Sequence, residues 1–357
     1  MNQRNLLLAL IALSLSASGG LGWYIINTPN ETPGVALTLQ QGAAYVPSKE
    51  GPTPSPQQSS GTLVTERTVS FMTAGPTSTS VLFVDTPSGR VYRIDTETRE
   101  EVPLSLRIPD LIDVRWSPLK TSLIARVRTP QGEQLKFVRL GEQKTSVLQK
   151  AVAAAFSPDG LSIATLEPGE PGGIFTQKLD GSERVQWTQT RALGGDLFWP
   201  QQNTLSLLVK NQSSQTGDVL LISRSGELGR VIAHHRSPQL LWAPNGEALL
   251  HTAQQGGEAS NLFITTLTGS YEVGVATSPH LCAWRKNSAG ILCVVKSGQE
   301  TRFVSYALGT EKVSTIPSDT VTAMGVRSIA INTLETSAFV VPASGVGIYT
   351  VPLSGLQ

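Results

Sequence analysis

The sequence predicts an all-β fold, a seven-bladed β-propeller, and two observations lead to this prediction. Aromatic or apolar anchor residues recur along the chain at a nearly constant spacing, and short apolar strands between turn residues fill each interval. The spacings are 45, 40, 43, 43, 42 and 47 residues, close to the length of one four-stranded propeller blade. The anchors are Phe71, Trp116, Phe156, Trp199, Trp242, Trp284 and Ile331. Six or eight blades are the alternatives for this repeat, and an unrelated β-sandwich is the competing fold.

The clearest repeat units share a turn that follows the anchor. Residues 156–160 read Phe-Ser-Pro-Asp-Gly, residues 242–246 read Trp-Ala-Pro-Asn-Gly, and residues 116–118 keep Trp-Ser-Pro. Proline presets φ, Asp or Asn bonds its own backbone, and Gly adopts positive φ, so each segment is expected to form a tight turn. A second apolar strand begins seven residues after the anchor; its first residues are Ile163, Leu249 and Ile291. The equal offset predicts one shared hairpin.

These units resemble the TolB-like propeller repeat, a relative of the WD-repeat propellers. The resemblance covers about residues 62–357 and is strongest in the third and fifth units. The fourth unit departs from it with Trp-Pro-Gln-Gln-Asn at 199–203, and the seventh with Ile-Asn-Thr-Leu at 331–334. The resemblance implies a propeller fold and protein partners in cell-envelope assemblies.

The two ends of the repeat region are expected to join. The last unit stops at Gln357 without a fourth strand, and Leu63–Thr65 have the position of an outer strand with no blade before them. We expect these residues to complete the last blade, because the ring then has no exposed edge that could pair with other chains.

The N-terminal region predicts a membrane tether. After a cytoplasmic N-terminus at residues 1–5, residues 6–26 are 21 uncharged residues, about 31 Å long as a helix, which matches the thickness of a bilayer core. Arg4 before this run and Trp23 near its end orient the remainder outside the cytoplasm. A cleaved signal peptide is the alternative. Residues 27–61, rich in Pro, Ser, Thr and Gln, are the predicted flexible linker, and residues 62–357 are the propeller.

The charge balance disfavours nucleic acid as a partner. The chain has 28 basic and 27 acidic residues, and only 15% of its residues are charged, so no net field attracts polyanions.

The two cysteines fall in the hairpin of the sixth unit. If Trp284 faces Ile291 across that hairpin, the same register places Cys282 directly opposite Cys293. Cross-strand neighbours lie within disulfide range, and an extracytoplasmic compartment permits oxidation. The sequence leaves two interpretations open, a disulfide or a pair of buried free thiols.

Signatures of catalysis are mostly missing from the sequence. The four histidines show no metal-ligand spacing with carboxylates, and no nucleophile elbow, phosphate loop or calcium loop is present. We therefore predict no enzyme activity, no cofactor and no metal. Residues scattered over several blades can still form a propeller active site, so an enzyme of the hydrolase or lyase type remains an alternative.

The predicted binding site is one mouth of the central channel. The loops that lead into the inner strands carry basic residues just before the anchors of units four to seven, so these side chains are expected to share a face. They are Arg191, His235, Arg236, His280 and Arg327. The competing interpretation is that they are solvated loop charges without a partner. A basic mouth would receive an acidic peptide or an anionic glycan.

The sequence as a whole predicts a recognition module without catalytic activity. We expect a propeller held on the outer side of a bacterial plasma membrane by a single helix, with a protein or glycan partner in an envelope assembly. A structural spacer of the cell surface is a further alternative. The oligomeric state is not predicted.

Overall fold

The computed structural model describes residues 61–142, 144–170, 172–211, 213–236, 238–253, 261–297, 300–316 and 318–353. The predicted N-terminus (1–5), the predicted transmembrane helix (6–26) and residues 27–60 of the predicted linker lie outside these ranges. Within them, no helix is both long and apolar enough to cross a membrane.

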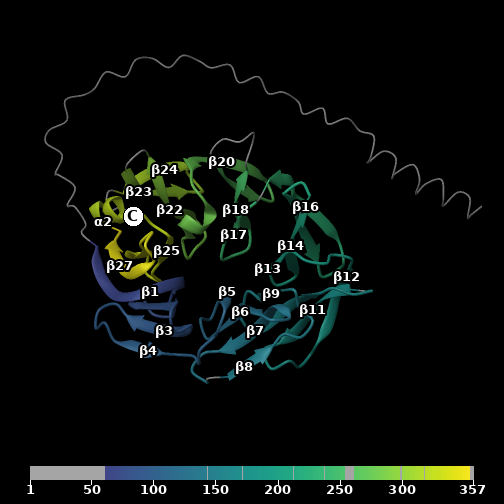
Figure 1. The fold of residues 1–357 in the computed structure, drawn as a ribbon. Coiled ribbons are helices and arrows are strands. Elements are labelled where there is room, and N and C mark those ends of the chain that lie inside the picture. The colour runs from purple at the N-terminus through teal and green to yellow at the C-terminus, as the bar shows by residue number, and fades with distance from the viewer. Residues whose placement is uncertain are drawn as a thin grey trace, which may run out of the picture. The chain divides into compact units, whose positions relative to one another are not determined.

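The described residues form antiparallel sheets arranged in a ring (Figure 1). Each blade is a sheet of four strands in chain order, and the first strand lies closest to the centre of the ring. Five blades are separate sheets, and one continuous seven-stranded sheet supplies the first and the last, so seven blades are present in the described part of the chain. The predicted all-β architecture of four-stranded units is confirmed.

The strand boundaries follow the repeat. Blade 1 contains the second half of β1 (Thr62–Ala74), β2 (Ser80–Asp85), β3 (Arg90–Asp95) and β4 (Glu101–Pro103). Blade 2 contains β5 (Leu111–Trp116), β6 (Ser122–Thr129), β7 (Gly132–Arg139) and β8 (Lys144–Val147). Blade 3 contains β9 (Ala153–Phe156), β10 (Ser162–Glu167), β11 (Gly172–Lys178) and β12 (Val185–Thr190). Blade 4 contains β13 (Asp196–Gln201), β14 (Thr204–Asn211), β15 (Thr216–Ser223) and β16 (Leu228–Arg236).

The remaining blades keep the same order. Blade 5 contains β17 (Leu240–Trp242), β18 (Ala248–Ala253), β19 (Asn261–Thr266) and β20 (Gly269–Ala276). Blade 6 contains β21 (Cys282–Trp284), β22 (Gly290–Ser297), β23 (Glu300–Ala307) and β24 (Lys312–Ile316). Blade 7 contains β25 (Ser328–Ile331), β26 (Ser337–Val341), β27 (Val346–Pro352) and the first half of β1. A short 3₁₀ helix, η1 (Pro279–Leu281), precedes blade 6, and the helix α2 (Asp319–Met324) precedes blade 7.

The ring closes through β1, as the sequence predicted. The first half of this strand pairs with β27, with Thr62 opposite Thr350 and Thr68 opposite Val346. Its second half pairs with β2 of blade 1. One strand therefore passes from the outer edge of the last blade to the inner edge of the first, and β27 and β2 both gain a pairing partner from it.

The anchor predicted for the first unit is wrong. Ala74, not Phe71, faces the residue seven positions later, Val81, as Trp116 faces Leu123 in blade 2. Phe71 lies inside a register shift of β1 and has a φ of +51°. The bulge adds residues to β1 between Phe71 and the hairpin. The nearest aromatic residue is therefore not the residue that precedes the hairpin turn, which is Ala74.

The shared hairpin register is confirmed in blades 3, 5 and 6, for which the sequence predicted it, whereas in blade 4 a register shift lies between Phe198 and Gln201. Phe156 faces Ile163, Trp242 faces Leu249, and Trp284 faces Ile291. The anchors of these blades are the last residues of their inner strands. They therefore lie next to the turns that join the first and second strands, which we call the hairpin turns.

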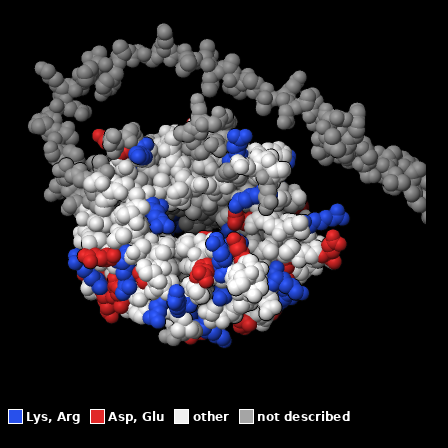
Figure 2. Space-filling model, in the orientation of Figure 1, with Lys and Arg blue, Asp and Glu red and all other residues white. Residues whose placement is uncertain are grey.

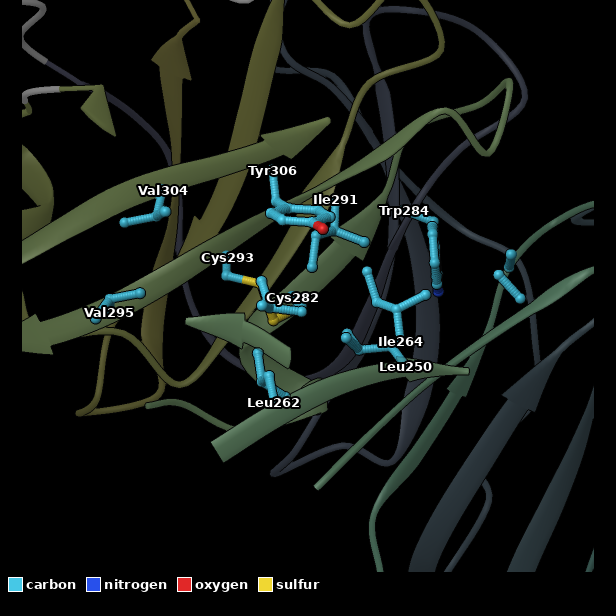
Figure 3. Packing of buried hydrophobic residues seen from close by; sticks show 13 residues of the cluster. Leu250, Leu262, Ile264, Cys282, Trp284, Ile291, Cys293, Val295, Val304 and Tyr306 are labelled. Carbon is cyan, nitrogen blue, oxygen red and sulfur yellow. A yellow bond between two sulfur atoms is a disulfide. The ribbon is translucent and has the colours of Figure 1, made fainter. Parts of the chain in front are cut away.

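The core consists of layers between neighbouring blades. In the described residues, seven clusters of buried apolar side chains are present, and each combines residues of two adjacent blades. Figure 3 shows the layer between blades 5 and 6, where Leu250 and Ile264 pack against Trp284 and Ile291. Burial of these faces holds the blades side by side and gives the inner strands fixed positions around the channel.

Candidate functional site

The main candidate site is a cavity at the centre of the ring, which we call the central cavity. It has a volume of about 880 Å³, and residues from the inner strands and hairpin turns of all seven blades line it. Figure 2 shows one face of the ring, with a central hollow bordered by basic and acidic residues. Because every blade contributes to the wall, the cavity depends on closure of the whole ring.

Aromatic side chains form much of the wall of this cavity. They come from the anchor positions and their neighbours: Trp116, Phe156, Phe198, Trp199, Trp242 and Trp284. Two of the indole N–H groups donate to the inner strand of the preceding blade, Trp116 to Phe71 O at 2.8 Å and Trp284 to Leu241 O at 3.0 Å. These bonds hold the rings in place where they border the cavity.

The hairpin turns connect each blade to the one before it. The residue four positions after the anchor has positive φ in five blades: +59° at Lys120, +70° at Gly160, +71° at Gly246, +57° at Ser288 and +58° at Glu335. At this position the turn touches the hairpin turn of the preceding blade. The contacts are Lys120 Nζ to Thr73 Oγ1 (3.0 Å), Asn245 N to Ser288 Oγ (3.1 Å), Arg285 Nε to Glu335 Oε2 (2.7 Å) and, at Ser78 of blade 1, Asn332 Nδ2 to Ser78 O (3.3 Å). These hydrogen bonds thus join blades 5 to 6, 6 to 7, 7 to 1 and 1 to 2 at the rim of the cavity.

The charged residues on the wall of the cavity are all cations. They are Arg115, Lys120 and Lys286, and no Asp or Glu is among the described residues that line it. In a space with apolar walls, such charges favour an anionic ligand.

Arg115 is held by a partner of opposite charge. Its Nη2 lies 3.2 Å from Asp196 Oδ1, and its Nη1 donates to the carbonyl oxygen of Leu197. Burial lowers the pKa of Arg115. Burial by itself would raise the pKa of Asp196, but a hydrogen bond from Lys210, at 2.6 Å, and the charge of Arg115 outweigh it, so the pKa of Asp196 is lowered. Arg115 thus fixes blade 2 against blade 4.

Lys120 has no such partner. In the described residues, its side-chain ammonium makes one hydrogen bond, to the hydroxyl of Thr73. Burial lowers the pKa of Lys120 to about 8. A fraction of its amine is therefore neutral slightly above pH 7, and the remaining ammonium lacks a counter-charge.

The residues predicted from the sequence lie elsewhere. Arg191 follows β12, His235 and Arg236 end β16, His280 is in η1, and Arg327 precedes β25. All five come before inner strands, whereas the central cavity is bordered by the turns after them, and none of the five lines it. Within the described residues no hydrogen bond or ion pair joins any two of them. Arg327 borders a smaller pocket of about 480 Å³ together with Asp110. Ligand binding at these residues stays a prediction.

Two histidines near the end of β16 pack against each other. The rings of His235 and His251 are 5.6 Å apart, and His251 also stacks on Phe263 at 5.8 Å. His251 Nε2 lies 2.9 Å from Thr265 Oγ1. Burial lowers the pKa of His251 to about 4 and also lowers the pKa values of His235 and His280. In the described residues no group of three or more His, Cys, Asp or Glu side chains is placed to hold a metal ion.

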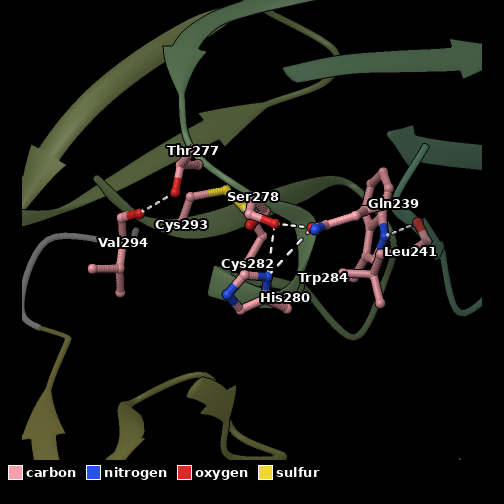
Figure 4. The surroundings of a disulfide bond; sticks show 9 residues. All are labelled: Gln239, Leu241, Thr277, Ser278, His280, Cys282, Trp284, Cys293 and Val294. Carbon is pink, nitrogen blue, oxygen red and sulfur yellow. Dashed lines mark hydrogen bonds between the residues drawn. A yellow bond between two sulfur atoms is a disulfide. The ribbon is translucent and has the colours of Figure 1, made fainter. Parts of the chain in front are cut away.

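The cysteines of blade 6 are bonded to each other (Figure 4). Cys282 on β21 is opposite Cys293 on β22, with their Cα atoms 4.0 Å apart, and this confirms the predicted register. Cys282 belongs to the wall of the central cavity. Beside it, Ser278 donates to Gln239 and lies 2.7 Å from His280 Nδ1. The disulfide thus ties the two innermost strands of this blade together where they border the cavity.

Sequence reasoning missed Arg115 and Lys120, although one signal was present. Residues 116–120 read Trp-Ser-Pro-Leu-Lys, where the third unit has Phe-Ser-Pro-Asp-Gly. A lysine at a position that requires positive φ is unusual, because a side chain there is strained. The same position holds Ser288 and Glu335 in blades 6 and 7, so this signal alone does not single out Lys120. No comparable signal exists for Arg115, whose role depends on the ring bringing Asp196 close.

The similarity of this chain to known proteins is confined to its fold. No protein-family model matches it, and no curated protein does. Among solved structures, an oligogalacturonate lyase from Vibrio parahaemolyticus aligns with a TM-score of 0.59 at 10% identity, over 84% of this chain and 92% of that one. The C-terminal WD40 domain of Sif2 aligns with a TM-score of 0.55 at 11% identity, over 84% and 100%. The chain is a β-propeller.

A third similar structure, streptogramin B lyase, aligns with a TM-score of 0.54 at 14% identity, over 82% of this propeller and 96% of that chain. These findings confirm the WD-repeat-like fold that the repeat pattern predicted. At such identities the similarity establishes the fold alone, and both enzymes and a WD40 domain share it. The function of the propeller has to be argued from its own site.

Proposed function

We propose that this propeller is a recognition module without catalytic activity, and that its central cavity binds a protein partner in a bacterial cell-envelope assembly. One observation carries the proposal: a cavity of about 880 Å³ has aromatic walls and three cations, and no carboxylate among the described lining residues. Its volume is in the range of ligand pockets, and buried aromatic residues commonly supply most of the binding energy of an interface.

The proposal includes the location of the protein in the cell. A helix at residues 6–26 would hold the chain in the plasma membrane, and the linker at 27–61 would let the propeller reorient outside the cytoplasm. Protease added to spheroplasts should then digest the propeller, and the protein should stay in the membrane pellet after a high-salt wash. Release of a mature chain that begins near Gly19 would show a cleaved signal peptide instead.

The recognition site can be tested by comparing the two faces of the ring. One variant combines Leu119→Asp with Lys286→Glu; both residues are exposed where they border the cavity, so folding should not suffer. The other combines Arg191→Glu, Arg236→Glu and Arg327→Glu on the loops predicted from the sequence. Partners that copurify from solubilised membranes should be lost from the first variant and kept by the second. Loss from the second alone would move the site to the loop face, and retention by both would contradict recognition through the channel.

A lyase or hydrolase is the second candidate function, and Lys120 favours it. Its pKa of about 8 suits a general base that works near neutral pH. Two of the similar solved structures are lyases, and this supports the candidate at the level of fold only. A soluble anionic oligosaccharide that the wild type converts and Lys120→Met does not would replace the recognition proposal with this one.

A further inference from the structure

Lys120 has a backbone conformation that is unfavourable for a residue with a side chain. This residue occupies the hairpin-turn position where Gly160 and Gly246 stand in blades 3 and 5, and its φ is +59°. Positive φ costs about 1–2 kcal/mol for a residue with a side chain. Ser288 and Glu335 have the same positive φ in blades 6 and 7, but of these three residues only Lys120 lines the central cavity.

The surroundings of Lys120 supply no negative charge. Its ammonium meets the hydroxyl of Thr73, and the other charged groups on the cavity wall are the cations Arg115 and Lys286. Arg115, by contrast, has Asp196 at 3.2 Å. A partly buried ammonium without a counter-ion is unfavourable, and an anion that enters the cavity would remove that penalty.

The walls around the ammonium restrict what the anion can be attached to. Trp199 and Trp284 are 9% exposed, and both line the cavity with largely apolar surface. The indole N–H groups of Trp116 and Trp284 are already bonded to backbone oxygens and so are not available to sugar hydroxyls. Apolar walls around a partly buried ammonium without a counter-ion fit a carboxylate at the end of an apolar chain segment.

We propose that Lys120 binds the C-terminal carboxylate of a partner polypeptide whose last side chains are apolar and pack against the aromatic wall of the central cavity. The proposal rests on the recognition function proposed above. It identifies the partner by its chemistry: a free main-chain carboxylate close to two or three apolar side chains. An internal Asp or Glu side chain does not meet this description, because the polypeptide would have to enter the cavity as a loop.

The probe is an array of hexapeptides with varied apolar residues at the last two positions, each made with a free C-terminal carboxylate and as the C-terminal amide. Binding to the detergent-solubilised full-length protein is measured by fluorescence anisotropy. The free acids should bind about 10-fold more tightly than their amides, as expected for a charge-assisted hydrogen bond. Lys120→Met should abolish this preference, whereas Lys144→Met, which replaces an exposed lysine on the outer strand β8 of the same blade, should leave it intact.

The pH dependence provides a second measurement. The wild-type preference for the free acid should decline as the pH rises through about 8, because Lys120 loses its proton. Lys120→Arg should keep the preference at higher pH, since a guanidinium stays charged. An identically folded Lys120→Arg variant also excludes loss of structure as the cause of the Lys120→Met result.

Several results would overturn the inference: equal binding of acids and amides, a preference that survives Lys120→Met, amidated peptides with an internal Asp that bind as well as the free acids, or no binding by any peptide of the array. Failure here can be told apart from failure of the recognition function. If envelope partners still depend on Leu119 and Lys286 while the carboxylate preference is missing, recognition stands and the assigned ligand group is wrong.

Discussion

Replacing His251 by glutamine should remove much of the acid sensitivity of the propeller between pH 7 and pH 5. The His251 side chain is 2% exposed, and its ring lies between His235 and Phe263. Burial lowers its pKa in the folded state from 6.5 to about 4. In the unfolded chain the ring takes up a proton near pH 6.5, whereas in the folded protein it stays neutral until a much lower pH.

The sign and size of the effect follow from these two pKa values. Because the folded-state pKa is the lower one, the contribution to stability is present above pH 6.5 and is lost as the pH falls toward 4. The full difference corresponds to about 3 kcal/mol, since one pKa unit is about 1.4 kcal/mol. Between pH 7 and pH 5 the loss should be about 2 kcal/mol.

Thermal unfolding followed by circular dichroism at both pH values, at constant ionic strength, measures this loss. For a domain of this size about 2 kcal/mol is a shift of about 4 °C in Tm. The drop in Tm from pH 7 to pH 5 should be smaller for His251→Gln than for the wild type by about that amount. Equal drops for wild type and His251→Gln would refute the reasoning.

Three further outcomes test the ring itself. Gly246→Ala places a Cβ 2.0 Å from Pro200 O at a φ of +71°, so urea unfolding should show a loss of more than about 2 kcal/mol. Gly181→Ala, with a φ of +87° and open space, should lose only about 1 kcal/mol, and similar losses for both would contradict the predicted contact. Replacing both Cys282 and Cys293 by Ala should lower stability by up to about 3 kcal/mol, because the disulfide closes a loop with a sequence separation of 11; unchanged urea midpoints would count against it. Deleting residues 61–66 removes the strand that pairs with β27, so light scattering and calorimetry should show aggregation or a lower Tm, and a stable monomer would exclude this closure.

The fold was predictable because its signal is repeated. Turn chemistry at 156–160 and 242–246, with the same offset to Ile163 and Leu249, marks the hairpin at several independent places. A single error, such as the anchor at Phe71, therefore did not disturb the architecture. That error had a local cause, a bulge in β1, which sequence spacing does not report.

The candidate site was less predictable, because it depends on which ends of the inner strands surround open space. Arg236 comes before the inner strand β17 and Lys120 comes after the inner strand β5, and composition gives no means of ranking the two ends. Both sets of loops contain charged residues, and only the structure shows that the large cavity lies beside the hairpin turns. The Arg115–Asp196 pair joins residues 81 positions apart, and only the closed ring brings them together.

Strand β1 belongs to both the last and the first blade, and this affects how the molecule can fold. Thr62 pairs with Thr350, a sequence separation of 288 residues, so the contact that completes the ring joins nearly the first and last described residues. Closing so long a loop is entropically expensive, and topologies dominated by distant contacts fold slowly. At a synthesis rate of about 5–20 residues per second, β27 is synthesised about 15–60 s after the first half of β1. During that interval Val64, buried in the finished ring, has no blade to cover it, and the nascent chain exposes an unpaired strand edge.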